Sequence, residues 1–98
     1  MKTITAILRT RPGTEATMRD ALLKIADHVR DSEPETIGYH ISQDASDPCV
    51  FTTYERFADQ AAMDRHGTSP ALAEFFKTAN PILDGAVIIH TGDEISAK

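Results

Sequence analysis

The chain has 98 residues, enough for one small domain that buries little more than about 60% of the surface of its unfolded form. Ten Lys and Arg against fifteen Asp and Glu give a formal net charge of -5, which argues against a nucleic-acid partner, because such binding needs clustered basic side chains. The longest apolar run, residues 85–89, is too short to cross a membrane, no secretory signal is recognisable, and the single Cys49 cannot form an internal disulfide, so we expect a cytoplasmic protein.

Residues 3–9 (TITAILR) predict the first strand, because every second residue is apolar and β-branched residues are frequent. Its apolar face consists of Ile4, Ala6 and Leu8. An RPG turn follows, and Thr14 is expected to cap a helix that begins at Glu15 and ends before Pro34. Four apolar residues at helical spacing predict the buried side of that helix, namely Met18, Leu22, Ile25 and Val29.

Residues 36–43 and 50–57 predict two more strands, separated by a turn at residues 44–48. In the first of them, Ile37, Tyr39 and Ile41 are expected to share one face. In the second, both faces carry aromatic residues. One of its faces is expected to hold Phe51, Thr53, Glu55 and Phe57.

Two short helices and a last strand complete the predicted elements. Asp59 is expected to cap a helix that ends at His66, and Ser69 a second helix that has Pro70 in its first turn and stops at Pro81. The second helix aligns an apolar stripe of Leu72, Phe75, Phe76 and Ala79. Residues 85–91 predict the fourth strand, and residues from about 93 to 98 a polar tail.

The order β-α-β-β-α-β over residues 1–98 predicts a single α+β domain with the ferredoxin-like fold, an antiparallel sheet with its helices on one face. The helical segments can cover only one face of this sheet, and large apolar residues are expected on both faces. Because soluble monomers rarely expose such a face, we expect a homodimer packed sheet against sheet.

Three blocks resemble the antibiotic biosynthesis monooxygenase family: SEPETIGYHISQD (residues 32–44), YERFADQAAMDRH (residues 54–66) and SPALAEFF (residues 69–76). Members of that family have a Tyr in the second strand, a Glu and then an aromatic residue in the third, and a His at the end of a short Ala-containing helix. The matching residues are Tyr39, Glu55, Phe57, Ala62 and His66. The resemblance implies a dimeric α+β barrel and, for its small members, oxidation of quinols without a cofactor.

Two positions depart from the family pattern. Glu35 stands where a glycine is usual, and Phe57 stands where a Trp is common. The chain has no Trp at all. Because haem-degrading relatives use an Asn, Trp and His set, this composition argues against haem as a substrate.

Glu55 and His66 are the first candidates for a catalytic pair. Glu55 lies on a largely apolar strand face, where a buried carboxylate needs a hydrogen-bonding partner. A Glu that accepts from one imidazole nitrogen fixes the tautomer and leaves the other nitrogen free to act as a base. The alternative is that the pair only ties the short helix to the strand. By the resemblance, His66 is the base, Glu55 its orienting partner and Tyr39 a hydrogen-bond donor to the substrate.

Five apolar residues could form the wall of a substrate-binding cavity or, alternatively, part of the core. They are Phe51, Phe57, Leu72, Phe75 and Phe76. No two of the four histidines have the i, i+4 spacing of a helical metal site, and Cys49 has no partner motif, so neither a metal nor a cofactor is expected.

Three functional hypotheses follow. The first is a cofactor-independent monooxygenase that uses dioxygen to oxidise a small aromatic substrate of the quinol or polyphenol type. The second keeps the same base but moves a proton without oxygen, as an isomerase or decarboxylase of a small oxygenated metabolite. The third is a dimer that binds a small molecule without catalysis.

Overall fold

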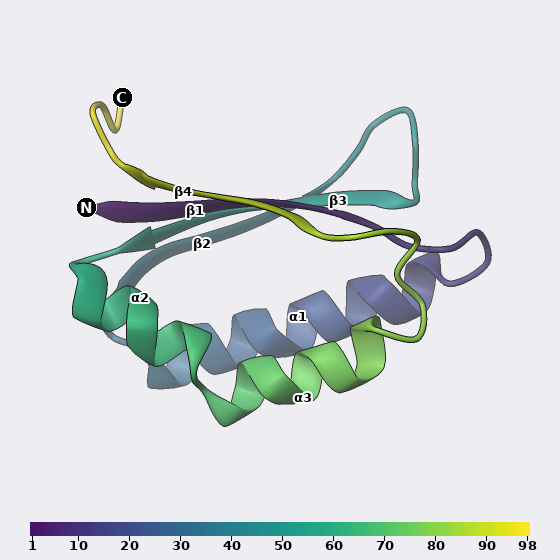
Figure 1. The fold of residues 1–98 in the computed structure, drawn as a ribbon, viewed down its shortest axis with the longest axis horizontal. Coiled ribbons are helices and arrows are strands. Elements are labelled where there is room, and N and C mark those ends of the chain that lie inside the picture. Colours follow the sequence, from purple (N-terminus) through teal and green to yellow (C-terminus); the bar gives the residue numbers. More distant parts are fainter.

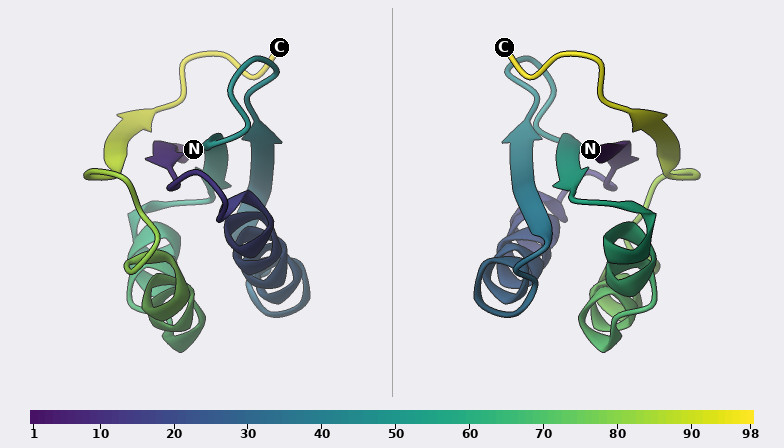
Figure 2. Two further views of the ribbon diagram at one scale, coloured as in Figure 1. Left: turned by 90° about the vertical axis from the view of Figure 1, so that its right-hand side faces the viewer. Right: turned by 90° about the vertical axis from the view of Figure 1, so that its left-hand side faces the viewer.

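The computed structural model describes residues 1–98 and has the predicted order of elements (Figure 1). The strands and helices are β1 (Lys2–Arg9), α1 (Glu15–Ser32), β2 (Thr36–Gln43), β3 (Val50–Phe57), α2 (Gln60–Gly67), α3 (Pro70–Ala79) and β4 (Ile88–Asp93). All strand pairs are antiparallel, and the strand order is β2-β3-β1-β4. The three helices lie on one face of the sheet (Figures 1 and 2). The ferredoxin-like α+β fold is therefore confirmed.

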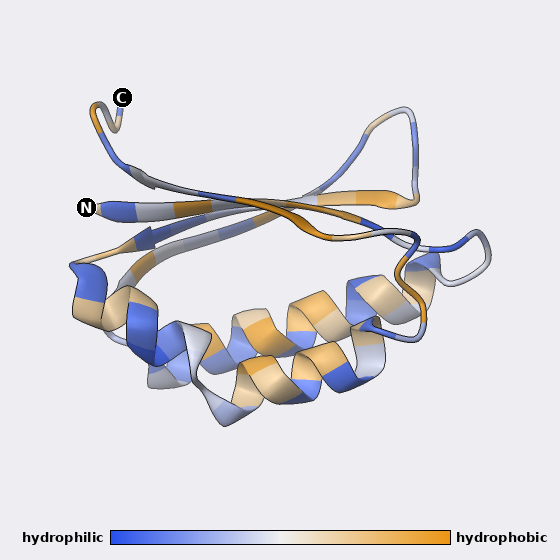
Figure 3. Ribbon diagram, viewed as in Figure 1, coloured by the Kyte–Doolittle hydropathy of each residue, from blue (hydrophilic) through white to orange (hydrophobic).

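The main core lies between the sheet and the helices α1 and α3. The predicted buried side of α1 is confirmed, since Met18, Leu22, Ile25 and Val29 are all buried. Ala6 and Leu8 of β1 and Phe51 of β3 meet them from the sheet. Figure 3 shows apolar and polar segments alternating along both helices, as expected for helices with one buried side. Removing this apolar surface from water is the main stabilising contribution to the fold.

A β-bulge in β2 corrects one prediction. The pairing with β3 shifts between Thr36 and Gly38, so Ile37 is the extra residue of the bulge and is exposed. Thr36 consequently pairs with Phe57 and lies on the helix side of the sheet, where the simple alternation had placed Ile37. This change matters because the Thr36 side chain reaches the candidate site.

The helix caps are confirmed at two of the three predicted places. Asp59 Oδ1 accepts a hydrogen bond from the Ala62 backbone N–H at 2.8 Å, and Ser69 Oγ accepts one from Leu72 at 3.1 Å. Thr14 precedes α1 as predicted, but its side chain does not cap the helix. The Thr14 hydroxyl instead donates to the Arg11 carbonyl oxygen at 2.6 Å, within the preceding turn.

The fourth strand lies further along the chain than its sequence predicted. It begins at Ile88 and extends to Asp93, so Asp93 belongs to the sheet and not to the tail. Glu94 belongs to the predicted polar tail, yet its carboxylate accepts hydrogen bonds from the Tyr54 hydroxyl at 2.7 Å and from Arg56 Nε at 2.9 Å. Figure 2 shows the last residues crossing the face of the sheet that the helices leave open.

That open face carries two exposed isoleucines side by side. Ile7 of β1 pairs directly with Ile88 of β4, and Tyr54 of β3 is also exposed there.

None of the helices has the length and apolar character needed to cross a membrane.

Candidate functional site

His66 lies in the last turn of α2, on the side of the helix that faces the sheet. Asp59 caps the first turn of this helix, which turns Ala62, Met63 and His66 inward. The His66 side chain is 3% exposed, and the rings of Tyr39 and Phe57 each lie with their centroids 5.5 Å from its own. The imidazole is therefore held among aromatic rings and shielded from bulk water.

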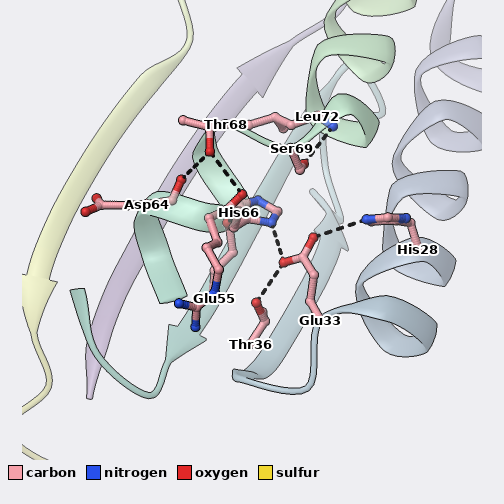
Figure 4. A network of polar contacts seen from close by, with 10 residues as sticks. His28, Glu33, Thr36, Glu55, Asp64, His66, Thr68, Ser69 and Leu72 are labelled. Atoms are coloured by element: carbon pink, nitrogen blue, oxygen red, sulfur yellow. Dashed lines mark hydrogen bonds and ion pairs between the residues drawn. The ribbon is translucent and has the colours of Figure 1, made fainter. Parts of the chain in front are cut away.

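Glu33 is the nearest partner of this imidazole (Figure 4). The distance from His66 Nδ1 to Glu33 Oε1 is 2.9 Å, and the Thr36 hydroxyl donates to the same oxygen at 2.8 Å. Because a carboxylate accepts and does not donate, this contact places the proton on Nδ1. The second ring nitrogen, Nε2, is then available for chemistry.

Glu55 lies on the other side of the ring. Its Oε1 is 3.4 Å from His66 Nε2, while its Oε2 accepts a hydrogen bond from the Thr53 hydroxyl at 2.7 Å. The predicted Glu55 and His66 pair is thus brought together. The sequence had indicated Glu55 as the residue that orients the ring, whereas the structure places Glu33 in that role. Glu55 is placed to stabilise a positive charge on the imidazole.

Burial raises the pKa of the Glu55 carboxyl above its ordinary value, against the opposing effects of the Thr53 hydrogen bond and the His66 charge. Burial also raises the pKa of the Tyr39 phenol, and the negative charges of Glu55 and Glu33 raise it further. The Tyr39 hydroxyl therefore keeps its proton at neutral pH and can donate a hydrogen bond.

A cavity of about 210 Å³ opens in front of His66, Glu55 and Tyr39, between the sheet and α3. Six of the predicted site residues line it: His66, Glu55, Tyr39, Leu72, Phe75 and Phe76. The other two predicted wall residues do not. Phe51 belongs to the main core, and Phe57 packs with Ala62 and Met63 behind the imidazole. Ten of the fourteen residues that line the cavity are hydrophobic. Its polar side chains lie together, since Glu55 contacts both Thr53 and His66 and the Tyr39 ring lies beside His66.

Sequence reasoning did not identify Glu33 and His28 as site residues. Glu33 sits 33 positions before its partner His66, and His28, like His40 and His90, is a lone histidine in the sequence, which is usually neither a ligand nor a base. A signal was nevertheless present, since Glu33 opens the Glu-Pro pair inside one of the blocks that resemble the monooxygenase family. No group of three His, Cys, Asp or Glu side chains is arranged to hold a metal ion.

The profile of one protein family, described as antibiotic biosynthesis monooxygenase, matches residues 1–78. The chain belongs to this family. No curated protein shows significant sequence similarity to the chain.

Solved structures agree on the fold. A structure described as a candidate antibiotic biosynthesis monooxygenase from Caulobacter crescentus is 22% identical with a TM-score of 0.91, and the match covers 97% of this chain and 90% of the other. One from Deinococcus radiodurans is 24% identical with a TM-score of 0.85, covering 100% and 96%. One from Nitrosomonas europaea is 15% identical with a TM-score of 0.90, covering 98% and 100%.

The buried Glu55 carboxyl predicts a specific pH dependence of stability. Both the folded and the unfolded chain carry the proton below the ordinary value of 4.5, and at higher pH the folded chain releases it later because its pKa is raised. The stability associated with this group is therefore present at low pH and is lost as the pH rises through the folded pKa. We expect the free energy of unfolding of Glu55→Gln, relative to the wild type, to increase between pH 4.5 and pH 8 in urea titrations.

Glu74→Gln is the matched control, because Glu74 is an exposed carboxylate on α3 and the change is the same. Its difference from the wild type should stay level across that range. A Glu55→Gln difference that shrinks with rising pH would contradict the assignment.

Proposed function

We propose that the chain is a cofactor-independent monooxygenase that uses dioxygen to oxidise a small, single-ring quinol. Family membership supports a monooxygenase. The observation that carries the finer proposal is the apolar cavity with His66, Glu55 and Tyr39 together at its polar end.

The dimensions of the cavity favour one aromatic ring. A cavity of about 150 Å³ lined by Leu, Ile and Phe is enough to bind benzene. The 210 Å³ present here leaves room for a ring with small substituents and is below the roughly 300 Å³ at which most ligand pockets begin. The walls formed by Leu72, Phe75 and Phe76 suit the faces of such a ring.

His66 acts as the base in the proposed reaction. Its Nε2 takes the proton from a phenolic hydroxyl, and the Glu55 carboxylate 3.4 Å away stabilises the resulting imidazolium. Glu33, bound to Nδ1, keeps the ring in the orientation that this transfer needs. Tyr39 donates a hydrogen bond to an oxygen of the substrate.

The electrons come from the substrate itself. The phenolate adds dioxygen at a ring carbon that carries hydrogen, which gives a hydroperoxide. The O–O bond then breaks, one oxygen stays on the carbon as a carbonyl, and the other leaves as water. A quinol and dioxygen thus give a hydroxylated quinone and water, with four electrons passing from the ring to oxygen. The apolar walls of the cavity limit the contact of water with the reactive phenolate during these steps.

In the proposed working state two copies pack through the open faces of their sheets. The exposed Ile7 and Ile88 lie next to each other on that face, and burying them would remove apolar surface from water. We expect a dimer by size-exclusion chromatography with light scattering. Ile7→Glu should yield the monomer, because it would bury two charges in the interface.

Leu23→Glu is the matched control for the dimer. Leu23 is also exposed but belongs to α1, in the helix layer and not on the open face of the sheet. A wild-type monomer at micromolar concentration, or a dimer that Ile7→Glu leaves intact, would contradict the proposed interface.

Oxygen uptake with a panel of quinols tests the proposed chemistry. We expect uptake with single-ring quinols, and a loss of about 100-fold or more in kcat in His66→Gln, since a general base contributes roughly 10²–10⁴-fold. Glu74→Gln is the control, because Glu74 is exposed on α3 and lies neither in the cavity nor on the open face of the sheet.

Three results would overturn the proposal in different ways. A His66→Gln variant that matches the wild type on a responsive quinol removes His66 from the chemistry. Turnover that continues without oxygen indicates an isomerase or decarboxylase. If His66→Gln binds the ligand as the wild type does and only loses about 1–3 kcal/mol in the free energy of unfolding, the protein is a binding protein whose buried Glu55 and His66 pair is structural.

A further inference from the structure

We infer that the ligand of the proposed site is a quinol whose ring carries an uncharged hydrocarbon chain, and that this chain leaves the cavity between β4 and α3, beside Ile89. The observation behind this inference is a cavity mouth with apolar walls that lies away from His66 and Glu55. Oxidation of this ligand rests on the proposed function. Its chemical class does not, because binding can be measured without oxygen.

The mouth of the cavity lies at the β4 edge of the sheet. Of the residues that line the cavity, only Gly67, at the end of α2, and Ile89, on β4, are exposed. All six residues of β4 are exposed, so the helix layer does not cover this strand. Figure 2 shows α2 and α3 on the side of the sheet that ends in β4, and α1 on the other side. The cavity therefore opens between β4 and the helices α2 and α3.

Strand register places the polar side chains and the mouth at opposite sides of the cavity. Tyr39 of β2 pairs with Glu55 of β3, whereas Ile89 of β4 pairs with Ala6 of β1. Because β1 lies between β3 and β4, and neighbouring strands are about 4.8 Å apart, β3 and β4 are separated by about 10 Å. An aromatic ring whose hydroxyl meets His66 fills only part of this width. A substituent on the far side of the ring then points to the mouth.

A small residue keeps the way to the mouth open. Ala6 is buried and stands between Thr53 and Ile89 in one row across the helix side of the sheet. On the same strand, Ile4 and Leu8 also line the cavity, one on each side of Ala6. Because the alanine side chain is a single methyl group, the floor of the cavity is lower at Ala6 than at its two larger neighbours.

The walls on this side of the cavity favour a hydrocarbon. Ile89 and the preceding Val87 contribute apolar side chains from the sheet edge, and Leu72 and Phe76 contribute them from α3. Ile89 is 54% exposed, so it has apolar surface left to cover. A hydrocarbon chain that contacts these side chains removes apolar surface from water on both partners, which strengthens binding.

No basic side chain is available to an anionic substituent. The lining of the cavity contains no Lys or Arg, and its one carboxylate, Glu55, repels an anion. β4 has no Lys or Arg either. Lys77 of α3 contacts Glu74 at 3.5 Å, and Arg65 of α2 contacts Glu35 at 2.6 Å. A chain that ends in a methyl group is therefore favoured over one that ends in a carboxylate.

The proposed dimer leaves the mouth free. Ile88 and Ile89 are consecutive residues of a strand, so their side chains point to opposite faces of the sheet. Ile88 pairs with Ile7 on the open face, through which the two copies pack, whereas Ile89 pairs with Ala6 on the helix side. The last residues of the chain also lie on the open face (Figure 2). The mouth is therefore accessible to a ligand in the proposed dimer.

Anaerobic binding measurements test the class of ligand. The probes are hydroquinone, butylhydroquinone and 3-(2,5-dihydroxyphenyl)propanoate, whose chain has a similar length but ends in a carboxylate. Full burial of one methylene strengthens binding about fourfold, so a chain half-buried at the mouth gains about twofold per carbon. We expect calorimetry on the wild type to give butylhydroquinone a Kd about tenfold below that of hydroquinone, and the propanoate no such gain.

Ile89→Lys tests the place of the chain, because it removes the apolar contact and puts a positive charge at the mouth. We expect it to weaken the binding of butylhydroquinone about tenfold, to strengthen that of the propanoate about threefold, and to leave that of hydroquinone within about twofold. Leu23→Lys is the matched control, because Leu23 is exposed on α1 and does not line the cavity. Ile89→Val keeps the apolar contact and should keep the preference of the wild type.

Three results would overturn the inference. One is a wild type that binds butylhydroquinone no more tightly than hydroquinone. Another is a preference for the chain that Ile89→Lys retains or that Leu23→Lys also loses, since the chain then does not lie beside Ile89. The third is a change of oligomeric state in Ile89→Lys, measured by size-exclusion chromatography, because a second copy then covers the mouth.

The same measurements separate the ligand class from the proposed function. A preference for the chain that is lost only in Ile89→Lys, in a wild type that oxidises none of these quinols, supports the ligand class and overturns the reaction. Oxidation of hydroquinone without any preference for the chain supports the reaction and overturns the ligand class.

Discussion

The hydrogen bond between Glu33 and His66 sets the geometry on which the rest of the site depends. It joins the end of α1 to the last turn of α2 and fixes which nitrogen of the imidazole carries the proton. With Nδ1 held, Nε2 points toward Glu55 and the cavity. The other oxygen of the same carboxylate lies 3.5 Å from Nε2 of His28, so Glu33 stands between the two imidazoles.

This arrangement has an energetic cost that the neighbouring residues reduce. Burial of a charged or polar group is unfavourable unless hydrogen bonds replace the lost water. Thr36 donates to Glu33 and Thr53 donates to Glu55, so each carboxylate has a hydroxyl partner besides the imidazole. The apolar core on α1 and the central strands supplies the stability that lets the domain tolerate these polar groups near its edge.

Much of the fold could be predicted because it follows from local patterns. The helical spacing of Met18, Leu22, Ile25 and Val29 and the caps at Asp59 and Ser69 depend on neighbouring residues, and the structure agrees with them. The errors arose where the outcome depends on pairing between segments. The bulge at Ile37 and the late start of β4 are set by strand register, which alternation within one segment does not reveal.

The same limit applies to the site. The meeting of Glu55, His66 and Tyr39 was predictable from strand and helix faces together with the family resemblance. The contact between Glu33 and His66 was not, because it depends on how the end of α1 is placed against α2. Phe51 and Phe57 lie on the expected face of β3, yet α1 and α2 cover them, and only the residues opposite α3 border the cavity.

The central claim is that His66 Nε2 faces a cavity that accepts one aromatic ring. A crystal structure of the protein soaked with hydroquinone in the absence of oxygen tests it most directly. The account predicts the ring among Leu72, Phe75 and Phe76, with one hydroxyl within hydrogen-bonding distance of His66 Nε2. A cavity that stays empty at saturating hydroquinone, or a ring bound with both hydroxyls away from His66, would contradict it.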